Sequence, residues 1–183
     1  MNAREEAPGQ LEQVRLFVNT LDREEAIERL PDAASLGAWL TEHGLAHGDV
    51  RATAGDLNRA TQLREALRQT LLAHNEGDPA PQEAAAVLDA AAARARVRLR
   101  FDAGAHARLE AEANGVDGAL GRLLAIVHAA MADGTWGRLK ACREQACEWA
   151  YYDQTRNHSR AWCDMQVCGN RAKARTYRRR HAS

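Results

Sequence analysis

Apolar residues recur every three or four positions along most of residues 1–137, which is the spacing of an amphipathic helix. We therefore predict a body of five helices. They cover residues 10–21, a stretch from a cap at Asp32 or Ser35 to Gly44, a stretch after Thr53, a stretch from Pro81 to Ala95, and Val116 to Met131. Many alanines and few aromatic residues also favour helix over sheet.

The third of these helices has the clearest division between its faces. Its apolar stripe consists of Leu57, Ala60, Leu63, Leu67 and Leu71. Arg64, Glu65 and Arg68 fall beside that stripe, so we predict that they form a charged flank in solvent.

The period changes after Ala95. Residues 96–101 alternate strictly between arginine and apolar side chains, as a half-buried strand does. Residues 102–105 can turn the chain back into a second strand near residues 106–111, and this is the only hairpin that we predict in the body. We interpret its arginine face as solvated sheet surface rather than as a binding site.

Asn19 and Thr20 are polar residues flanked by apolar ones near the end of the first helix. A local cap or a side chain-to-backbone hydrogen bond is the simpler interpretation. A small-molecule pocket in the body is the alternative that this pair suggests, and its ligand-binding residues stay unassigned.

The only four cysteines lie near the C-terminus in two pairs, Cys142-x4-Cys147 and Cys163-x4-Cys168. Each pair can supply two thiolates from one tight turn, and the fifteen residues between the pairs can bring the two turns together. A tetrahedral zinc site needs this arrangement. We therefore predict Zn²⁺ as the cofactor, with all four cysteines as its ligands.

Disulfides and thiol chemistry are the alternatives for these cysteines. Residues 1–8 lack the apolar segment of a secretory signal, and no stretch approaches the roughly 18 apolar residues of a membrane helix. We therefore expect a cytoplasmic protein without a membrane partner, in which clustered thiols stay reduced and bind metal. A nucleophilic cysteine would need a base, for which His158 is nearest, but that role does not require four paired cysteines.

The formal net charge of zero hides an asymmetry. Residues 138–183 hold eleven Lys or Arg against four Asp or Glu, whereas residues 1–137 hold fourteen against twenty-one. Four thiolates on one Zn²⁺ remove about two of the positive charges from the C-terminal part. Basic charge beside an ordered metal site indicates a polyanion such as nucleic acid, with a solvated basic tail as the plainer alternative.

A basic helix is expected directly after the last cysteine. Gly169 permits a tight turn around the sulfur, and Asn170 can cap the helix. Arg171 and Lys173 fall in the first turn, where the anionic metal centre or a bound phosphate would offset their unfavourable interaction with the helix dipole. One face of this helix carries Arg171, Arg175 and Arg178.

Aromatic residues surround the cysteines. Trp149, Tyr151 and Tyr152 predict a short strand whose rings cover the metal turns, and Trp162 lies beside the third ligand. A module this small has little other core, so we favour a packing role over base stacking for these rings.

The segment from Cys142 to His181 resembles the CGNR zinc finger, which is named for the tetrapeptide found here at residues 168–171. The match extends back through Asp153, Thr155-Arg156-Asn157, Ser159-Arg160 and Trp162-Cys163. The preceding part resembles, through fewer residues, the ABATE domain of bacterial stress-induced transcription regulators. Those residues are Phe17-Val18-Asn19-Thr20, Leu36 to Leu40 and Leu63-Arg64-Glu65-Ala66-Leu67. The resemblance implies a DNA-binding finger behind a domain that senses a ligand.

We therefore expect a mainly α (α+β) fold. Residues 1–137 form a helical domain with one small β-hairpin, and residues 138–183 form a four-cysteine zinc finger that ends in a basic helix. The function that these patterns favour is zinc-dependent regulation of transcription, with a small molecule as the effector of the N-terminal domain. The finger would bind duplex DNA through Arg156, Arg160, Arg171, Lys173, Arg175 and Arg178.

A zinc-stapled module that binds protein or RNA, without sequence-specific DNA binding, is the alternative. The chain has no Gly-rich phosphate loop after a strand, no HExxH motif and no serine nucleophile elbow, so we do not expect an enzyme. A homodimer is compatible with the sequence and would require paired half-sites in the DNA.

Overall fold

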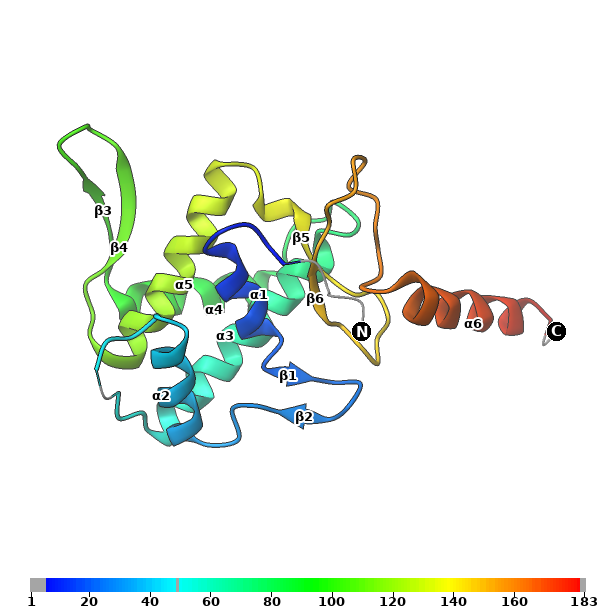
Figure 1. Ribbon diagram of the computed structural model, residues 1–183, viewed down its shortest axis with the longest axis horizontal. Coiled ribbons are helices and arrows are strands. Elements are labelled where there is room, and N and C mark those ends of the chain that lie inside the picture. The colour runs from blue at the N-terminus through cyan, green and yellow to red at the C-terminus, as the bar shows by residue number, and fades with distance from the viewer. Residues whose placement is uncertain (1–5, 49, 182–183) are drawn as a thin grey trace.

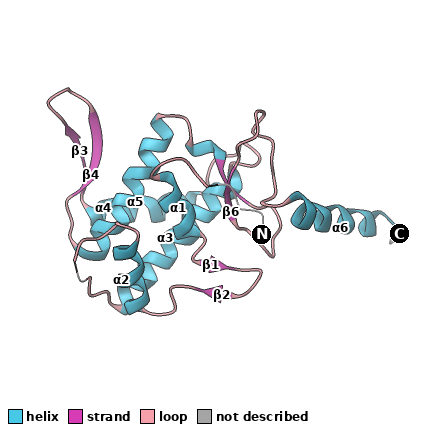
Figure 2. Cartoon of the chain, in the orientation of Figure 1, coloured by secondary structure: helices cyan, strands magenta, loops and turns pink. Residues whose placement is uncertain are grey.

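The computed structural model describes residues 6–48 and 50–181, and helices form most of it (Figure 2). The helices are α1 (Leu11–Val18), α2 (Ala33–Glu42), α3 (Ala54–Ala73), α4 (Gln82–Ala95), α5 (Gly115–Ala132) and α6 (Asn170–His181). Three antiparallel strand pairs join β1 (Leu21–Asp22) to β2 (Ile27–Glu28), β3 (Val97–Phe101) to β4 (Ala107–Ala111), and β5 (Leu139–Ala141) to β6 (Ala150–Tyr152). The predicted mainly α class is confirmed, and each predicted helix is present.

Capping residues explain where two of the helices begin. The Asp32 carboxylate accepts a hydrogen bond from the Ser35 backbone N–H at 2.8 Å and starts α2. Thr53 and Asp56 form a reciprocal capping box before α3. Gly44 lies just after α2 with φ of +67°, a left-handed conformation that glycine adopts without strain.

One hydrophobic core extends from the helical body into the C-terminal segment. Its centre consists of fully buried residues from α1, α2, α3 and α5, such as Phe17, Leu40, Leu63 and Leu123. The same cluster also contains residues of β5 and β6, namely Leu139, Ala141, Ala150 and Tyr152. The division into domains 1–137 and 138–183 stays a prediction, but the two parts share packing.

The strands differ from the prediction in two ways. The pair β3–β4 forms in the predicted place, yet it is not half-buried, because Leu99 and Phe101 are 52% and 67% exposed. The hairpin projects from one end of the molecule, so the helices cover little of either face (Figure 1). The expectation of a single hairpin in the body is also wrong, because β1–β2 is a second one whose two-residue strands are too short to show alternation.

Helix α5 extends one residue beyond the predicted Val116 to Met131 at each end, and it bears on the expectation that no stretch approaches a membrane helix. Its 18 residues have a mean hydropathy of 1.3, which by length and composition alone suffices to cross a membrane. Half of this helix is buried against the rest of the protein. A core helix of a soluble protein has the same character, so one such helix is weak evidence for a membrane span.

Candidate metal centre and nucleic-acid interface

The first cysteine pair lies in the turn between β5 and β6. The backbone N–H of Cys142 donates to the Trp149 carbonyl at 3.0 Å, which continues the pairing of the two strands. Within the turn, the N–H of Cys147 donates to the Glu144 carbonyl at 2.8 Å. The strand pairing therefore fixes the backbone of Cys142, and a hydrogen bond within the turn fixes that of Cys147.

The second pair flanks and enters a wide helical turn, Met165–Gly169, that runs directly into α6: Cys163 lies two residues before the turn and Cys168 lies within it. Asp164 caps this turn, because its Oδ1 accepts hydrogen bonds from the N–H groups of Gln166 and Val167 at 2.7 and 3.1 Å. The predicted N-cap role of Asn170 is wrong, since Asn170 has helical dihedrals of −68° and −38° and its side chain donates to the Gln166 carbonyl.

The structure does not support the expected role of Gly169 in a tight turn. Its φ is not in the left-handed region, so conformational freedom is not the explanation. A Cβ at this position would meet the end of the Met165 side chain, closest at its sulfur. Met165 is exposed and flexible, so a small side chain at residue 169 would displace it without moving the backbone.

All four sulfur atoms converge on one point. They lie within 4.8 Å of one another, with Cys147 Sγ 3.6 Å from Cys163 Sγ and Cys163 Sγ 3.8 Å from Cys168 Sγ. A tetrahedron with Zn–S bonds of about 2.3 Å has sulfur–sulfur edges of about 3.8 Å. All four side chains are buried, so the donor set and its spacing fit a closed structural metal site.

The thiols interact strongly with one another. Hydrogen bonds with Cys147 and Cys163 lower the pKa of Cys142 to about 3, and hydrogen bonds with Cys142 and Cys147 raise the pKa of Cys163. Burial raises the pKa of Cys168. Because thiolates are the ligating form, a bound cation would replace the shared protons, and metal binding at this site is expected to release them.

The aromatic cover around the cysteines is confirmed in part. Tyr151 is 1% exposed and packs against the cysteines together with Trp149 and Trp162. Its hydroxyl donates to the Arg160 carbonyl at 2.7 Å. Tyr152 points to the other side of β6 and joins the main core instead, as alternation along a strand requires.

Residues 142–147 form the first metal turn, and residues 163–169 form the second. A buried ion pair shapes the loop between these two metal turns. Lys140 Nζ lies 3.0 Å from Asp153 Oδ2, and both side chains are almost fully buried. Burial alone would raise the pKa of Asp153, but hydrogen bonds from Thr155 and Lys140 hold it below its usual value. Lys140 also donates to the carbonyls of His158 and Arg160, so this pair fixes the path of the loop toward Cys163.

The six cations predicted to contact DNA fall into three groups. Arg160 is turned into the finger, where it donates to the carbonyls of Trp162 and Cys163 and lies 5.0 Å from the centre of the Tyr151 ring. Two are ion-paired with carboxylates, namely Arg171 with Glu24 and Arg175 with Glu144. The exposed cations without an ion pair among the described residues are Arg156, Lys173 and Arg178.

The pairing of Arg175 bears on its predicted role as a DNA contact. Its guanidinium is 2.6 Å from the carboxylate of Glu144, whose side chain is only 3% exposed. A buried carboxylate without a partner is costly, so Glu144 holds Arg175 and with it the direction of α6. A charge reversal at Arg175 would therefore disturb the finger as well as any contact with DNA.

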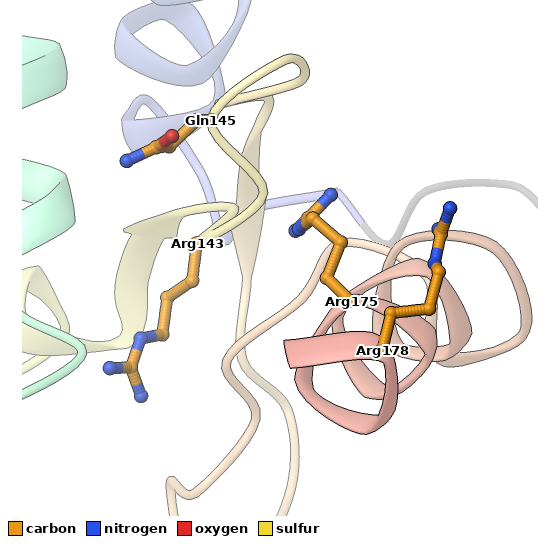
Figure 3. A pocket seen from close by; sticks show the side chains of 4 residues that line it. All are labelled: Arg143, Gln145, Arg175 and Arg178. Atoms are coloured by element: carbon orange, nitrogen blue, oxygen red, sulfur yellow. The ribbon is translucent and has the colours of Figure 1, made fainter. Parts of the chain in front are cut away.

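A polar cleft of about 510 Å³ separates the first metal turn from α6. Figure 3 shows the four lining residues, with Arg175 and Arg178 on the helix and Arg143 and Gln145 on the turn, and the Arg143 side chain points away from α6. Of the three arginines around this cleft, Arg143 pairs with Glu76 and Arg175 with Glu144, so Arg178 is the one without an ion pair among the described residues. Arg143 and Gln145 were not predicted from the sequence, because only the folded chain brings the first cysteine turn next to α6.

The contacts that join the helical body to the zinc finger were also not predicted from the sequence. Arg64 and Arg68 are 3% and 1% exposed, so the predicted solvent-facing flank is wrong. Arg68 donates to the carbonyls of Val18 at 2.6 Å and Glu148 at 2.7 Å, which links α1 to the first metal turn. Arg64 forms two 2.8 Å hydrogen bonds with the Glu28 carboxylate. These partners come from distant parts of the chain, so helical periodicity alone could not reveal them.

Comparison with known protein families agrees with this architecture. Residues 16–134 match the ABATE family, described as "Putative stress-induced transcription regulator", and residues 138–181 match the CGNR zinc finger. The first match spans more than half of the chain, so the protein belongs to this family of transcription regulators. Its metal-binding segment is a CGNR zinc finger. A search of curated proteins gave no match.

Proposed function

We propose that this protein regulates transcription by binding duplex DNA through its zinc finger. The observation that supports this most directly is the position of α6, which projects from the metal centre away from the body (Figure 1). The side chains of residues 173–178 are all exposed, and Lys173 and Arg178 among them carry positive charge. Arg171 and Arg175 near the start of the helix are ion-paired with Glu24 and Glu144, so Lys173 and Arg178 are the cations that this basic helix offers to a polyanion.

Zinc is the proposed metal. Four thiolates in tetrahedral arrangement suit Zn²⁺, and a closed set of four protein ligands is typical of its structural sites. The proposed role of the ion is to hold the two cysteine turns together. Because Cys168 lies two residues before the start of α6, the ion would also fix the position of that helix. This role concerns binding, and we propose no catalytic activity.

Phosphate contacts would supply most of the affinity. Exposed Lys173 and Arg178, with Arg156 from the neighbouring loop, are best placed to bind the DNA backbone, while Arg178 is also a candidate for a base edge. Arg160 contributes instead to the structure of the finger through its internal hydrogen bonds. A dimer of the chain would align two such fingers on paired half-sites.

An effector site in the helical body is a separate proposal. Asn19 and Thr20 no longer motivate it, because their side chains are bonded to the protein itself. A cleft of about 260 Å³ between α3, α4 and α5 is the better candidate, since it combines apolar residues with Arg59, Arg94 and Asp117. Thermal-shift screening of small organic acids tests it, with Arg94→Ala expected to abolish any stabilisation.

The DNA-binding proposal is tested by fluorescence anisotropy of a labelled mixed-sequence duplex, titrated with the zinc-loaded chain over a range of salt. Three to six phosphate contacts predict a slope of log K against log salt of about −3 to −5. Equal or tighter binding to RNA would favour the RNA-interaction alternative. Absence of salt-dependent binding to either nucleic acid would contradict the proposal.

A further inference from the structure

The turn between β1 and β2 brings acidic residues from the body against the basic helix. Residues 22–28 contain Asp22, Glu24, Glu25 and Glu28 against a single Arg23. The Glu24 carboxylate lies 2.5 Å from the Arg171 guanidinium, in the first turn of α6. This ion pair joins residues 147 positions apart, and it connects the ABATE domain directly to the proposed DNA-binding helix.

The structure holds this turn firmly in place. Asp22 Oδ1 accepts hydrogen bonds from the N–H groups of Glu24 and Glu25 at 3.1 and 3.2 Å, which fixes the shape of the turn. Arg23 pairs with Glu65 on α3 at 2.8 Å and with Glu148 beside the first metal turn at 2.6 Å. The backbone and Arg23 therefore anchor the turn, and Glu24 is presented to α6 without an anchoring role of its own.

The Glu24 carboxylate makes the contact with Arg171 that a DNA phosphate would make. Both are oxyanions that accept charge-assisted hydrogen bonds from a guanidinium. A phosphate brought to Arg171 would also be repelled by the carboxylate beside it. The side chains are 48% and 24% exposed for Arg171 and Glu24, so their pair is of the weak, displaceable kind found at surfaces.

We propose that the acidic β1–β2 turn is an intramolecular competitor of DNA, with Glu24 occupying Arg171 until a phosphate of the duplex displaces it. The proposal rests on the proposed function for the identity of the competing polyanion. Through this contact the N-terminal domain would influence DNA binding by the finger. Any change in the body that moves the β1–β2 turn would alter how much positive charge on α6 is available to DNA.

The test compares Glu24→Gln with Glu25→Gln in the full-length, zinc-loaded chain. Both variants remove one negative charge from the same turn, but Glu25 is exposed and has no ion pair among the described residues. We expect Glu24→Gln to tighten duplex binding about two- to fivefold, the range that an exposed ion pair allows, and Glu25→Gln to change it much less. Hydrogen exchange at residues 22–28 should accelerate when the wild-type chain binds the duplex.

The outcomes separate this inference from the function on which it rests. Equal affinities of the two variants, when the wild-type chain binds DNA, would overturn the competition and leave DNA binding standing. Failure of both the wild type and Glu24→Gln to bind would overturn the DNA-binding function and the inference together. Binding by Glu24→Gln alone would support the competition in its strongest form.

Discussion

The side-chain amide of Asn19 pairs with the backbone of Ala150 as a neighbouring strand would. Asn19 Nδ2 donates to the Ala150 carbonyl at 2.9 Å, and Asn19 Oδ1 accepts from the Ala150 N–H at 2.8 Å. Both residues are buried. One side chain at the end of α1 thus completes the hydrogen bonding of β6, the strand that follows the first metal turn.

Asn19→Leu should therefore destabilise the protein. The variant leaves a buried N–H and a buried carbonyl without partners, and each such group costs about 1–3 kcal/mol. We expect urea unfolding of the zinc-loaded chain to show a loss of about 2–4 kcal/mol. Asn58→Leu, at an exposed position on α3, is the control and should change stability by less than about 0.5 kcal/mol. Similar losses in both variants would contradict the account.

Much of the architecture follows from local patterns in the sequence. The helix limits near Asp32, Thr53 and Pro81 follow from caps and helix starters, and the metal ligands follow from the spacing of the only four cysteines. These features depend on residues a few positions apart. The hairpin β3–β4 was placed correctly for the same reason.

The joint between body and finger could not be predicted in this way. Arg68 falls on the polar side of a helical wheel, and only the folded chain shows that backbone carbonyls of Val18 and Glu148 surround its guanidinium. The carboxylates that pair with Arg171 and Arg175 are also distant in the sequence. The sequence therefore suggested more unpaired positive charge on α6 than the structure has.

His74 should make stability depend on pH. Burial lowers its pKa below the ordinary value of 6.5, and nearby Lys140 lowers it further. Its Nδ1 lies 2.7 Å from the Leu139 carbonyl, so that nitrogen carries the hydrogen. The unfolded chain binds more protons than the folded one below about pH 6.5, and this contribution to stability is therefore complete above that pH and is lost as the pH falls.

The measurement is urea unfolding at about pH 7.5 and about pH 5.5. In the unfolded chain, His74 is mostly neutral at the first pH and mostly protonated at the second. His74→Asn keeps a donor for the Leu139 carbonyl but does not titrate. We expect the variant to lose less stability than the wild type on acidification. An identical loss in both proteins, with metal content verified at each pH, would show that His74 does not contribute.

Loss of a metal ligand should affect more than the finger. Cys168→Ser removes one thiolate from the site, so the variant should retain little zinc and its finger should unfold. Because β5 and β6 contribute to the shared core, we also expect the helical body to melt at a lower temperature. Metal analysis should give one zinc per wild-type chain. A variant with unchanged zinc content and melting temperature would contradict the assignment of Cys168 as a ligand.

The most direct test of the central claim asks whether α6 itself contacts DNA. Lys173→Gln combined with Arg178→Gln removes two exposed charges from the helix without breaking an ion pair to a described residue. The slope of log K against log salt should become less steep by about 1.8, at about 0.9 per lost phosphate contact. The control combines Arg29→Gln with Arg51→Gln, the same charge change at exposed sites on the body, and should leave the slope unchanged. If the helix variant keeps the wild-type slope and affinity, or changes no more than the control, α6 does not bind DNA and the proposed function is wrong.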